Sequence, residues 1–158
     1  LGLLAAGLAL LLNPPAVRAG QDEDAFKADL LKLNDLKTED ALLKALRALI
    51  KDREKAKKAV ALGTKLQKDA KDGDKPFSFG GAYVLGRAAH VVKNYDAAAY
   101  FLEHAAEVAA KAERGEQMVQ AYARLVDLSM DQKKYQDAVD VCERVVELKG
   151  PDEIENAQ

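Results

Sequence analysis

The sequence Tyr95-Asp96-Ala97-Ala98 recurs 40 residues later as Tyr135-Gln136-Asp137-Ala138. When this offset is kept fixed, identical residues pair at Leu85/Leu125, Lys93/Lys133, Tyr95/Tyr135, Ala98/Ala138, Glu103/Glu143 and Glu107/Glu147. Apolar residues also pair at Ala82/Tyr122, Phe101/Val141, Leu102/Cys142, Ala105/Val145 and Val108/Leu148. A repeat of this length is typical of stacked helical hairpins, in which each hairpin contacts only its neighbours. Because such stacks leave a long face free, the repeat predicts a surface for partners.

The composition agrees with one domain-sized folded body. The chain has 158 residues, of which 32% are charged, 49% hydrophobic and 6% aromatic, and it has no Trp. Its formal net charge is −2, which does not favour nucleic-acid binding, since that function requires a strong basic excess. The single cysteine, Cys142, cannot form an internal disulfide. Because it aligns with Leu102, we expect a buried apolar thiol.

The N-terminal residues have the pattern of a secretory signal. Residues 1–12 are uncharged and apolar, and as a helix they span roughly 18 Å, well short of a ~30 Å hydrocarbon core. Pro14-Pro15 and then Val17-Arg18-Ala19 follow. We predict a signal peptide at 1–19, cleaved after Ala19, and an exported protein of the periplasm, cell surface or extracellular space. No membrane insertion is expected after cleavage; the alternatives are a buried helix, an uncleaved anchor or an apolar run that arose by chance.

Helical periodicity accounts for the remaining chain. We expect an N-terminal segment at 20–38 with a short helix at 22–35, then a degenerate or capping hairpin at 39–75 whose first helix is capped by Thr38. Two hairpins follow at 76–115 and 116–150, with helices at 77–92, 95–112, 116–132 and 135–149. No segment alternates as a strand would, so the class is all-α. Gly150-Pro151 ends a helix, and 151–158 reads as the start of a truncated next repeat.

Residues 82–151 resemble the tetratricopeptide repeat (TPR) family. One copy has Leu85-Gly86 followed by Tyr95, Ala98, Leu102 and Ala105, and the next has Tyr122, Leu125, Tyr135, Ala138, Cys142, Val145 and Pro151. Gly86, Ala89, Ala98 and Ala105 are small enough for two helices to approach closely, and Asn94 is placed to cap the second helix. The resemblance implies a right-handed superhelical array of antiparallel helical hairpins, a TPR-like α-solenoid. It also implies a scaffold or adaptor.

The chain departs from the family pattern at three points. Val126 stands in place of the glycine, Ala82 in place of the aromatic residue, and the period is 40 where the family has roughly 34. The extra residues fall around 110–116, where Gly115 offers a break. The chain is therefore similar to the longer-helix variant of the repeat.

The resemblance implies that the first helix of each hairpin lines a concave groove. We expect an exposed stripe that binds a protein or peptide, with Tyr83 as its aromatic anchor. The residues predicted to bind the partner are Tyr83, Arg87, His90, Gln120, Asp127 and Asp131. The acids at 127 and 131 would repel a C-terminal carboxylate, so the family's carboxylate clamp is not expected. The alternative is that these are ordinary solvated polar residues.

No other group of residues predicts a metal, cofactor or catalytic site. His90 and His104 have no second ligand at i+3 or i+4, so no metal site or cofactor is predicted. Residues 51–75 hold nine basic and five acidic residues, which we interpret as a solvated face. There is no phosphate loop and no nucleophile with a base in plausible reach. We predict a non-catalytic scaffold; the alternative is the N-terminal arm of a longer exported enzyme.

Overall fold

The computed structural model describes residues 15–70 and 76–149 of the chain. Within these ranges it has seven α-helices, one 3-10 helix and no strand. The elements are α2 (Pro15–Leu31), η1 (Lys32–Asp35), α3 (Glu39–Ile50), α4 (Arg53–Asp69), α5 (Phe79–Val91), α6 (Tyr95–Lys111), α7 (Gly115–Asp131) and α8 (Tyr135–Lys149). The all-α prediction is therefore confirmed for this part of the chain. The predicted bounds from residue 77 onward agree with α5 to α8 within two residues.

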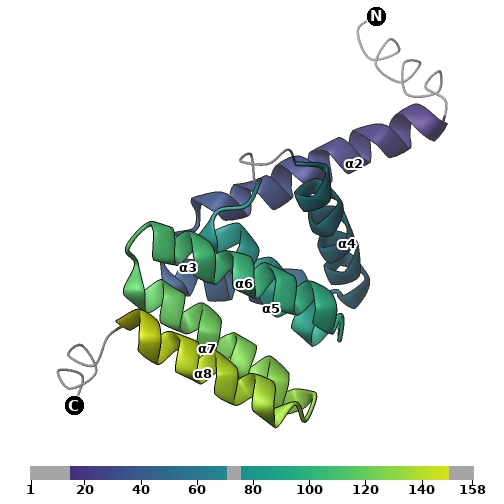
Figure 1. Cartoon of the computed structure of the whole chain (residues 1–158). Helices are drawn as coiled ribbons and strands as arrows, with labels where there is room; N and C mark the ends of the chain where they lie inside the picture. Colours follow the sequence, from purple (N-terminus) through teal and green to yellow (C-terminus); the bar gives the residue numbers. More distant parts are fainter. Residues whose placement is uncertain (1–14, 71–75, 150–158) are drawn as a thin grey trace, which may run out of the picture.

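Helices α5 to α8 form an antiparallel stack in which each helix packs on the next (Figure 1). On the other side of the stack, α3 and α4 pack against α5, so α5 lies at the centre of the molecule. Helix α2 runs across η1 and one end of α4, and its first turns project away from the other helices (Figure 1). The result is a layered helical body with a splayed N-terminal helix.

Three of the helices have a side-chain cap at their N-terminus. Thr38 Oγ1 accepts a hydrogen bond from the backbone N–H of Ala41 (3.4 Å), and Asn94 Oδ1 accepts one from Ala97 (3.3 Å). Both predicted caps are thus confirmed. Asp52 caps α4, where its Oδ1 accepts from the N–H groups of Glu54 (2.9 Å) and Lys55 (3.0 Å). Each cap satisfies donors that the first turn of a helix leaves without a partner.

One turn conformation recurs at all three connections of the α5–α8 stack. Lys93, Glu113 and Lys133 have φ values of 64°, 55° and 59°, in the left-handed region. In each turn the N–H of the following residue donates to a carbonyl five residues back, as from Asn94 to Ala89 (2.9 Å). This is the hydrogen-bond pattern that ends helices at a left-handed residue. The break between α6 and α7 therefore centres on Glu113, and not on Gly115 as expected.

These turns predict a stabilising substitution. An L-residue in the left-handed region costs about 1–2 kcal/mol, whereas glycine adopts it freely. We expect Glu113→Gly to raise the free energy of unfolding by about 1 kcal/mol, less the entropy that glycine gains in the unfolded chain. Urea denaturation followed by circular dichroism measures it. Glu103→Gly, in the exposed interior of α6, is the matched control and should lower stability by about 1 kcal/mol; a loss in both variants would contradict the turn assignment.

Small residues let the central helices approach closely, as the sequence predicted. Ala89, Ala98 and Ala105 are fully buried. A Cβ atom at Gly86 would lie 2.7 Å from Leu102 Cγ on α6, and one at Gly63 would lie 2.8 Å from Leu85 Cδ1. Both distances are shorter than carbon atoms tolerate, so these glycines set the spacing of α5 against its neighbours.

The N-terminal part differs from the expectation. The predicted short helix at 22–35 is instead the C-terminal part of α2 followed by η1, and α2 begins at Pro15, before the predicted cleavage point. Proline suits the first position of a helix, where its missing N–H costs nothing. Cleavage after Ala19 remains a prediction. The apolar segment 1–12 and the predicted helix start at 151–154 lie outside the described residues.

Polar contacts attach this N-terminal part to the start of α5. Asn34 Nδ2 donates to the carbonyl of Pro76 (2.7 Å), and its Oδ1 accepts from the N–H of Ser78 (2.9 Å). The hydroxyl of Ser78 donates in return to the Asn34 carbonyl (2.9 Å). The same segment also contacts α6, where His104 Nε2 lies 3.0 Å from the carbonyl oxygen of Phe77. The three hydrogen bonds of Asn34 with Pro76 and Ser78 fix η1, and α2 that precedes it, at the start of the central helix α5.

Candidate binding surfaces

The six residues predicted to bind a partner all lie on α5 and α7, and the structure brings most of them together. The hydroxyl of Tyr83 accepts hydrogen bonds from Arg87 Nη1 (3.3 Å) and Arg124 Nε (3.4 Å). Arg124 Nη1 also donates to Asp127 Oδ2 (2.8 Å). At the far end of the two helices, His90 Nε2 lies 2.8 Å from Asp131 Oδ2. We call these residues, with Gln120, the α5–α7 polar cluster.

The prediction that Tyr83 is an exposed anchor is wrong. Only 6% of its surface is accessible, and its ring stacks on Phe79 with the centroids 5.4 Å apart. The guanidinium carbon of Arg87 lies 5.9 Å from the centroid of the ring. Helix α5 has no free face at this point, because α3 packs on it as well as α6, and every residue from Phe79 to Gly86 is buried. The tyrosine therefore stabilises the fold.

Arg124 is a member of the cluster that sequence reasoning missed. Hydrogen bonding to the Tyr83 hydroxyl, and secondly to Asp127, raises the pKa of its guanidinium above the ordinary value. Its position three residues before Asp127 is the spacing of an ion pair on one helix face, which is the signal that could have identified it. Arg124 on α7 thus links the two helices through the Tyr83 hydroxyl on α5, and it also binds the Asp127 carboxylate on its own helix.

The cluster is half-open to solvent. Asp127 and Asp131 are exposed, whereas His90 and Arg124 are partly covered. The bonds that hold these groups are intramolecular, so a ligand at this face would compete with them. No group of three or more His, Cys, Asp or Glu residues that could hold a metal ion occurs in residues 15–70 and 76–149. The hydrogen bonds of the cluster therefore mainly connect α5 to α7.

The expectation of a buried thiol is also wrong, because Cys142 is exposed. Its counterpart Leu102 is fully buried. Among the described residues, α6 packs between α5 and α7, whereas α8 packs mainly against α7. The same sequence position is thus core in one hairpin and surface in the next.

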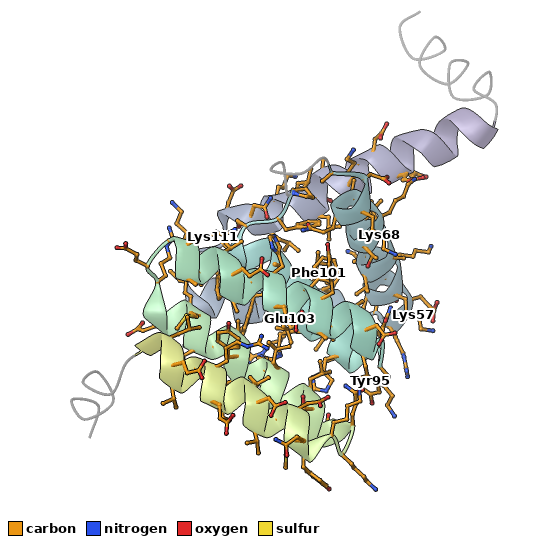
Figure 2. The ribbon with its side chains drawn as sticks, in the orientation of Figure 1. Lys57, Lys68, Tyr95, Phe101, Glu103 and Lys111 are labelled. Atoms are coloured by element: carbon orange, nitrogen blue, oxygen red, sulfur yellow. The ribbon has the colours of Figure 1, made fainter. Side chains whose placement is uncertain are left out.

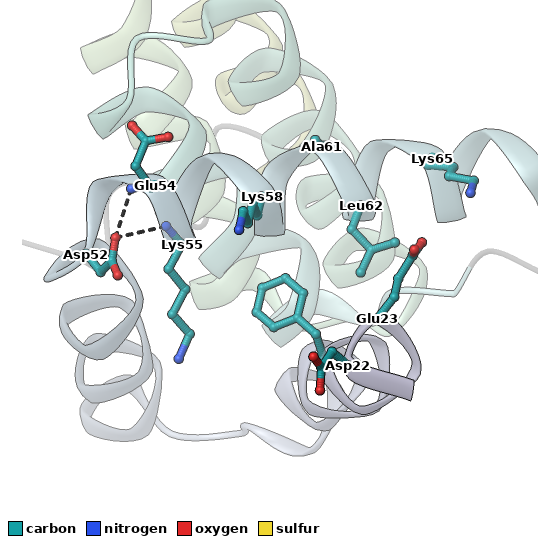
Figure 3. Close-up of a pocket in the computed structure, with 10 residues that line it drawn as sticks. Asp22, Glu23, Asp52, Glu54, Lys55, Lys58, Ala61, Leu62 and Lys65 are labelled. Atoms are coloured by element: carbon teal, nitrogen blue, oxygen red, sulfur yellow. Dashed lines mark hydrogen bonds between the residues drawn. The ribbon is translucent and has the colours of Figure 1, made fainter. Parts of the chain in front are cut away.

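A groove between α2 and α4 was not predicted (Figure 3). It has a volume of about 740 Å³, within the range of about 300–1,000 Å³ that ligand pockets occupy. Its apolar members are Phe26 from α2 and Ala61 and Leu62 from α4. In Figure 3, Leu62 points from α4 toward α2, where Glu23 lies beside it. We call this the α2–α4 groove.

The two walls of the α2–α4 groove carry charges of opposite sign. The α2 wall presents Asp22 and Glu23, and the α4 wall presents three lysines. These lysines and Leu62 lie at positions i, i+3, i+7 and i+10, which share one face of the helix. The four residues are Lys55, Lys58, Leu62 and Lys65. Asp52 and Glu54 close the end where α4 begins. The basic excess at 51–75 is the sequence signal of this surface, and the prediction of a solvated face did not identify the groove.

Comparison of the chain with models of protein families, with curated proteins and with solved structures found no match. None of the helices in the described ranges is long and apolar enough to cross a membrane. The function is therefore inferred from the geometry of these surfaces.

Proposed function

We propose that this protein is an exported, non-catalytic scaffold that binds another protein through helical-repeat surfaces, as a section of a TPR-like right-handed α-solenoid. The observation that carries the proposal is the α2–α4 groove, in which apolar side chains lie between an acidic and a basic wall. Open apolar surface rimmed by polar residues marks sites of interaction with proteins or other ligands. All residues of the groove follow the predicted cleavage point after Ala19, so it would be kept in the mature protein.

The occupant that suits the groove is an amphipathic helix. Its apolar stripe would cover Phe26, Ala61 and Leu62, which removes apolar surface from water. Acidic residues along one edge would face the lysines of α4, and basic residues along the other would face Asp22 and Glu23. Opposite charges on the two walls therefore also fix the direction in which the helix lies.

The α5–α7 polar cluster is a second candidate for contact. Arg87, His90, Gln120, Asp127 and Asp131 remain predicted partner residues, but Tyr83 does not, because its ring is buried. A partner there would have to replace hydrogen bonds that the chain already makes. Such an exchange brings little net free energy, so we place the main binding surface in the groove.

Charge reversal on α4 tests the proposal. The probe is a fluorescent helical peptide of about 18 residues, or about five turns, with a leucine stripe edged by Glu on one side and Lys on the other. We expect Lys55→Glu with Lys58→Glu to weaken binding about tenfold, since each exposed pair contributes about 0.2–1 kcal/mol and reversal replaces attraction by repulsion. Fluorescence anisotropy measures the affinity.

Two controls make the result specific. Lys44→Glu with Lys68→Glu makes the same change in net charge at exposed lysines outside the groove and should leave affinity unchanged. A peptide in which the Glu edge is replaced by Lys should recover binding to the reversed protein. Equal loss in both double variants, or no saturable binding to the unmodified chain, would reject the groove.

A further inference from the structure

Helix α2 is attached to the rest of the molecule mainly at its C-terminal end. Between residues 22 and 31, Leu30 is the one buried side chain, with 4% of its surface accessible, while Phe26 and Leu31 are partly buried. The next element, η1, follows directly and is bound to the start of α5 through Asn34. The N-terminal part of α2 projects away from the other helices (Figure 1). The helix is thus an arm that is held at one end.

The junction between α2 and η1 is the place where this arm can turn. The α-helix ends at Leu31 and the 3-10 helix begins at Lys32, so the hydrogen-bond pattern changes there. A 3-10 stretch often marks a hinge, because its hydrogen bonds have poorer geometry than those of an α-helix. The bonds of Asn34 hold η1 itself in place. Rotation at the junction would therefore move α2 while η1 stays on α5.

The charged side chains on the two walls of the α2–α4 groove face each other without pairing. Asp22 on α2 and Lys55 on α4 lie on opposite sides of the groove (Figure 3). Among the described residues, no ion pair joins Asp22 or Glu23 to a lysine of α4. The field of the α4 wall nevertheless reaches α2. The pKa of the Asp29 carboxyl is lowered first by its hydrogen bond to Lys32 and by the charge of Lys32, and to a smaller degree by the charge of Lys55.

Movement of α2 toward α4 would satisfy both the charged and the apolar groups of the groove. It shortens the distance between opposite charges, whose attraction extends far at low salt. It also brings Phe26 further onto Ala61 and Leu62, which removes apolar surface from water. A helix that fills the groove would prevent both contacts, so closure and occupation exclude each other.

We propose that α2 is a hinged arm that closes on α4 when the α2–α4 groove is empty and opens to admit a partner helix. The structure has the open form, in which the groove has a volume of about 740 Å³. The closed arm takes the place of the partner and competes with it. The gating of a partner rests on the proposed function, whereas the closure itself does not. Opening removes only the closed fraction from competition, so the loss of affinity expected for Lys55→Glu with Lys58→Glu stands.

Double electron–electron resonance between two spin labels measures the closure. The labels are attached at Ala25→Cys in α2 and Lys57→Cys in α4, both exposed and outside the groove lining, in a chain that also carries Cys142→Ser. Without peptide, we expect a second, shorter distance at about 0.01 M salt, by up to about 10 Å, the diameter of one helix. It should disappear at about 1 M salt, because the Debye length falls from about 30 Å to about 3 Å.

Charge reversal separates attraction across the groove from a general effect of salt. Asp22→Lys with Glu23→Lys should lower the closed-to-open ratio at low salt about tenfold, since attraction to the lysines becomes repulsion. Addition of Lys55→Glu and Lys58→Glu exchanges the charges of the two walls. The protein with exchanged charges is the matched control and should recover the shorter distance.

Three results would overturn the proposal. A single distance that responds to neither salt nor charge reversal would show that α2 does not close. Absence of the shorter distance after charge exchange would show that the two walls do not attract each other. The peptide edged by Glu and Lys should restore the longer distance at low salt, and bound peptide that leaves the shorter distance in place would reject the gating. A chain that closes but does not bind the peptide in fluorescence anisotropy would support the closure and reject the proposed function, so the two failures are distinguishable.

Discussion

Replacement of Phe101 by alanine is expected to lower the free energy of unfolding by about 3–5 kcal/mol, the range for large core aromatics. The ring is fully buried and meets Phe77 edge to face, with the centroids 5.9 Å apart at 81°. It also reaches α4, since its Cζ lies 3.2 Å from the position of a Cβ at Gly63. Figure 2 shows Phe101 in the interior between α4 and α6, whereas Lys57 and Lys111 point outward. The alanine variant would leave a cavity where three segments meet.

The adjacent residue supplies the control for this experiment. Tyr100 is 42% exposed and meets Phe101 edge to face with the centroids 5.6 Å apart, so Tyr100→Ala removes an aromatic ring of similar size that is largely at the surface of the same helix. It should cost no more than about 1 kcal/mol. Urea unfolding of both variants, followed by circular dichroism, compares the two losses. Similar losses would mean that α6 does not present Phe101 to the core.

Gly80→Ala is the second substitution with a large expected effect, about 3 kcal/mol, at the upper end of the range for overpacking. A Cβ at this position would lie 2.6 Å from the carbonyl oxygen of Leu33 and 2.7 Å from that of Leu36. These are backbone atoms, so no side-chain rotation relieves the clash. We expect η1 and α2 to detach from α5, and the α2–α4 groove to lose affinity for its peptide together with the loss of stability.

Gly115→Ala is the matched glycine control. Nothing lies within 4 Å of a Cβ there, and the residue is the first of α7. It should be neutral or stabilise the fold by up to about 1 kcal/mol, because alanine loses less backbone entropy than glycine. Thermal unfolding and peptide affinity measured on both variants test the account. A Gly80→Ala protein with unchanged stability would contradict the docking of η1 on α5.

The sequence was sufficient to predict the helices from residue 39 onward, because periodicity and caps are local properties. Thr38 and Asn94 were recognised from the residue type before an apolar repeat, and both cap as expected. The close approach at Gly86 followed from its small size within a matched repeat. Each of these inferences needed only residues within one hairpin.

The surfaces could not be predicted in the same way, because exposure depends on which helices are neighbours. Tyr83 is buried because α3 also packs on α5, and Cys142 is exposed although the aligned Leu102 is buried. The α2–α4 groove joins residues 22–26 to 52–65, two segments without a shared motif. Their meeting is set by Asn34 and Gly80, whose contacts are long-range and leave no periodic signal.

The most direct test of the binding account is amide chemical-shift mapping of the isotope-labelled chain during titration with the peptide edged by Glu and Lys. We predict that the largest shift changes fall on residues 22–26 of α2 and 52–65 of α4, with smaller changes at Arg87 and Asp127. Changes confined to the α5–α7 polar cluster, or none while the spectrum remains that of a folded protein, would contradict the α2–α4 groove as the binding surface.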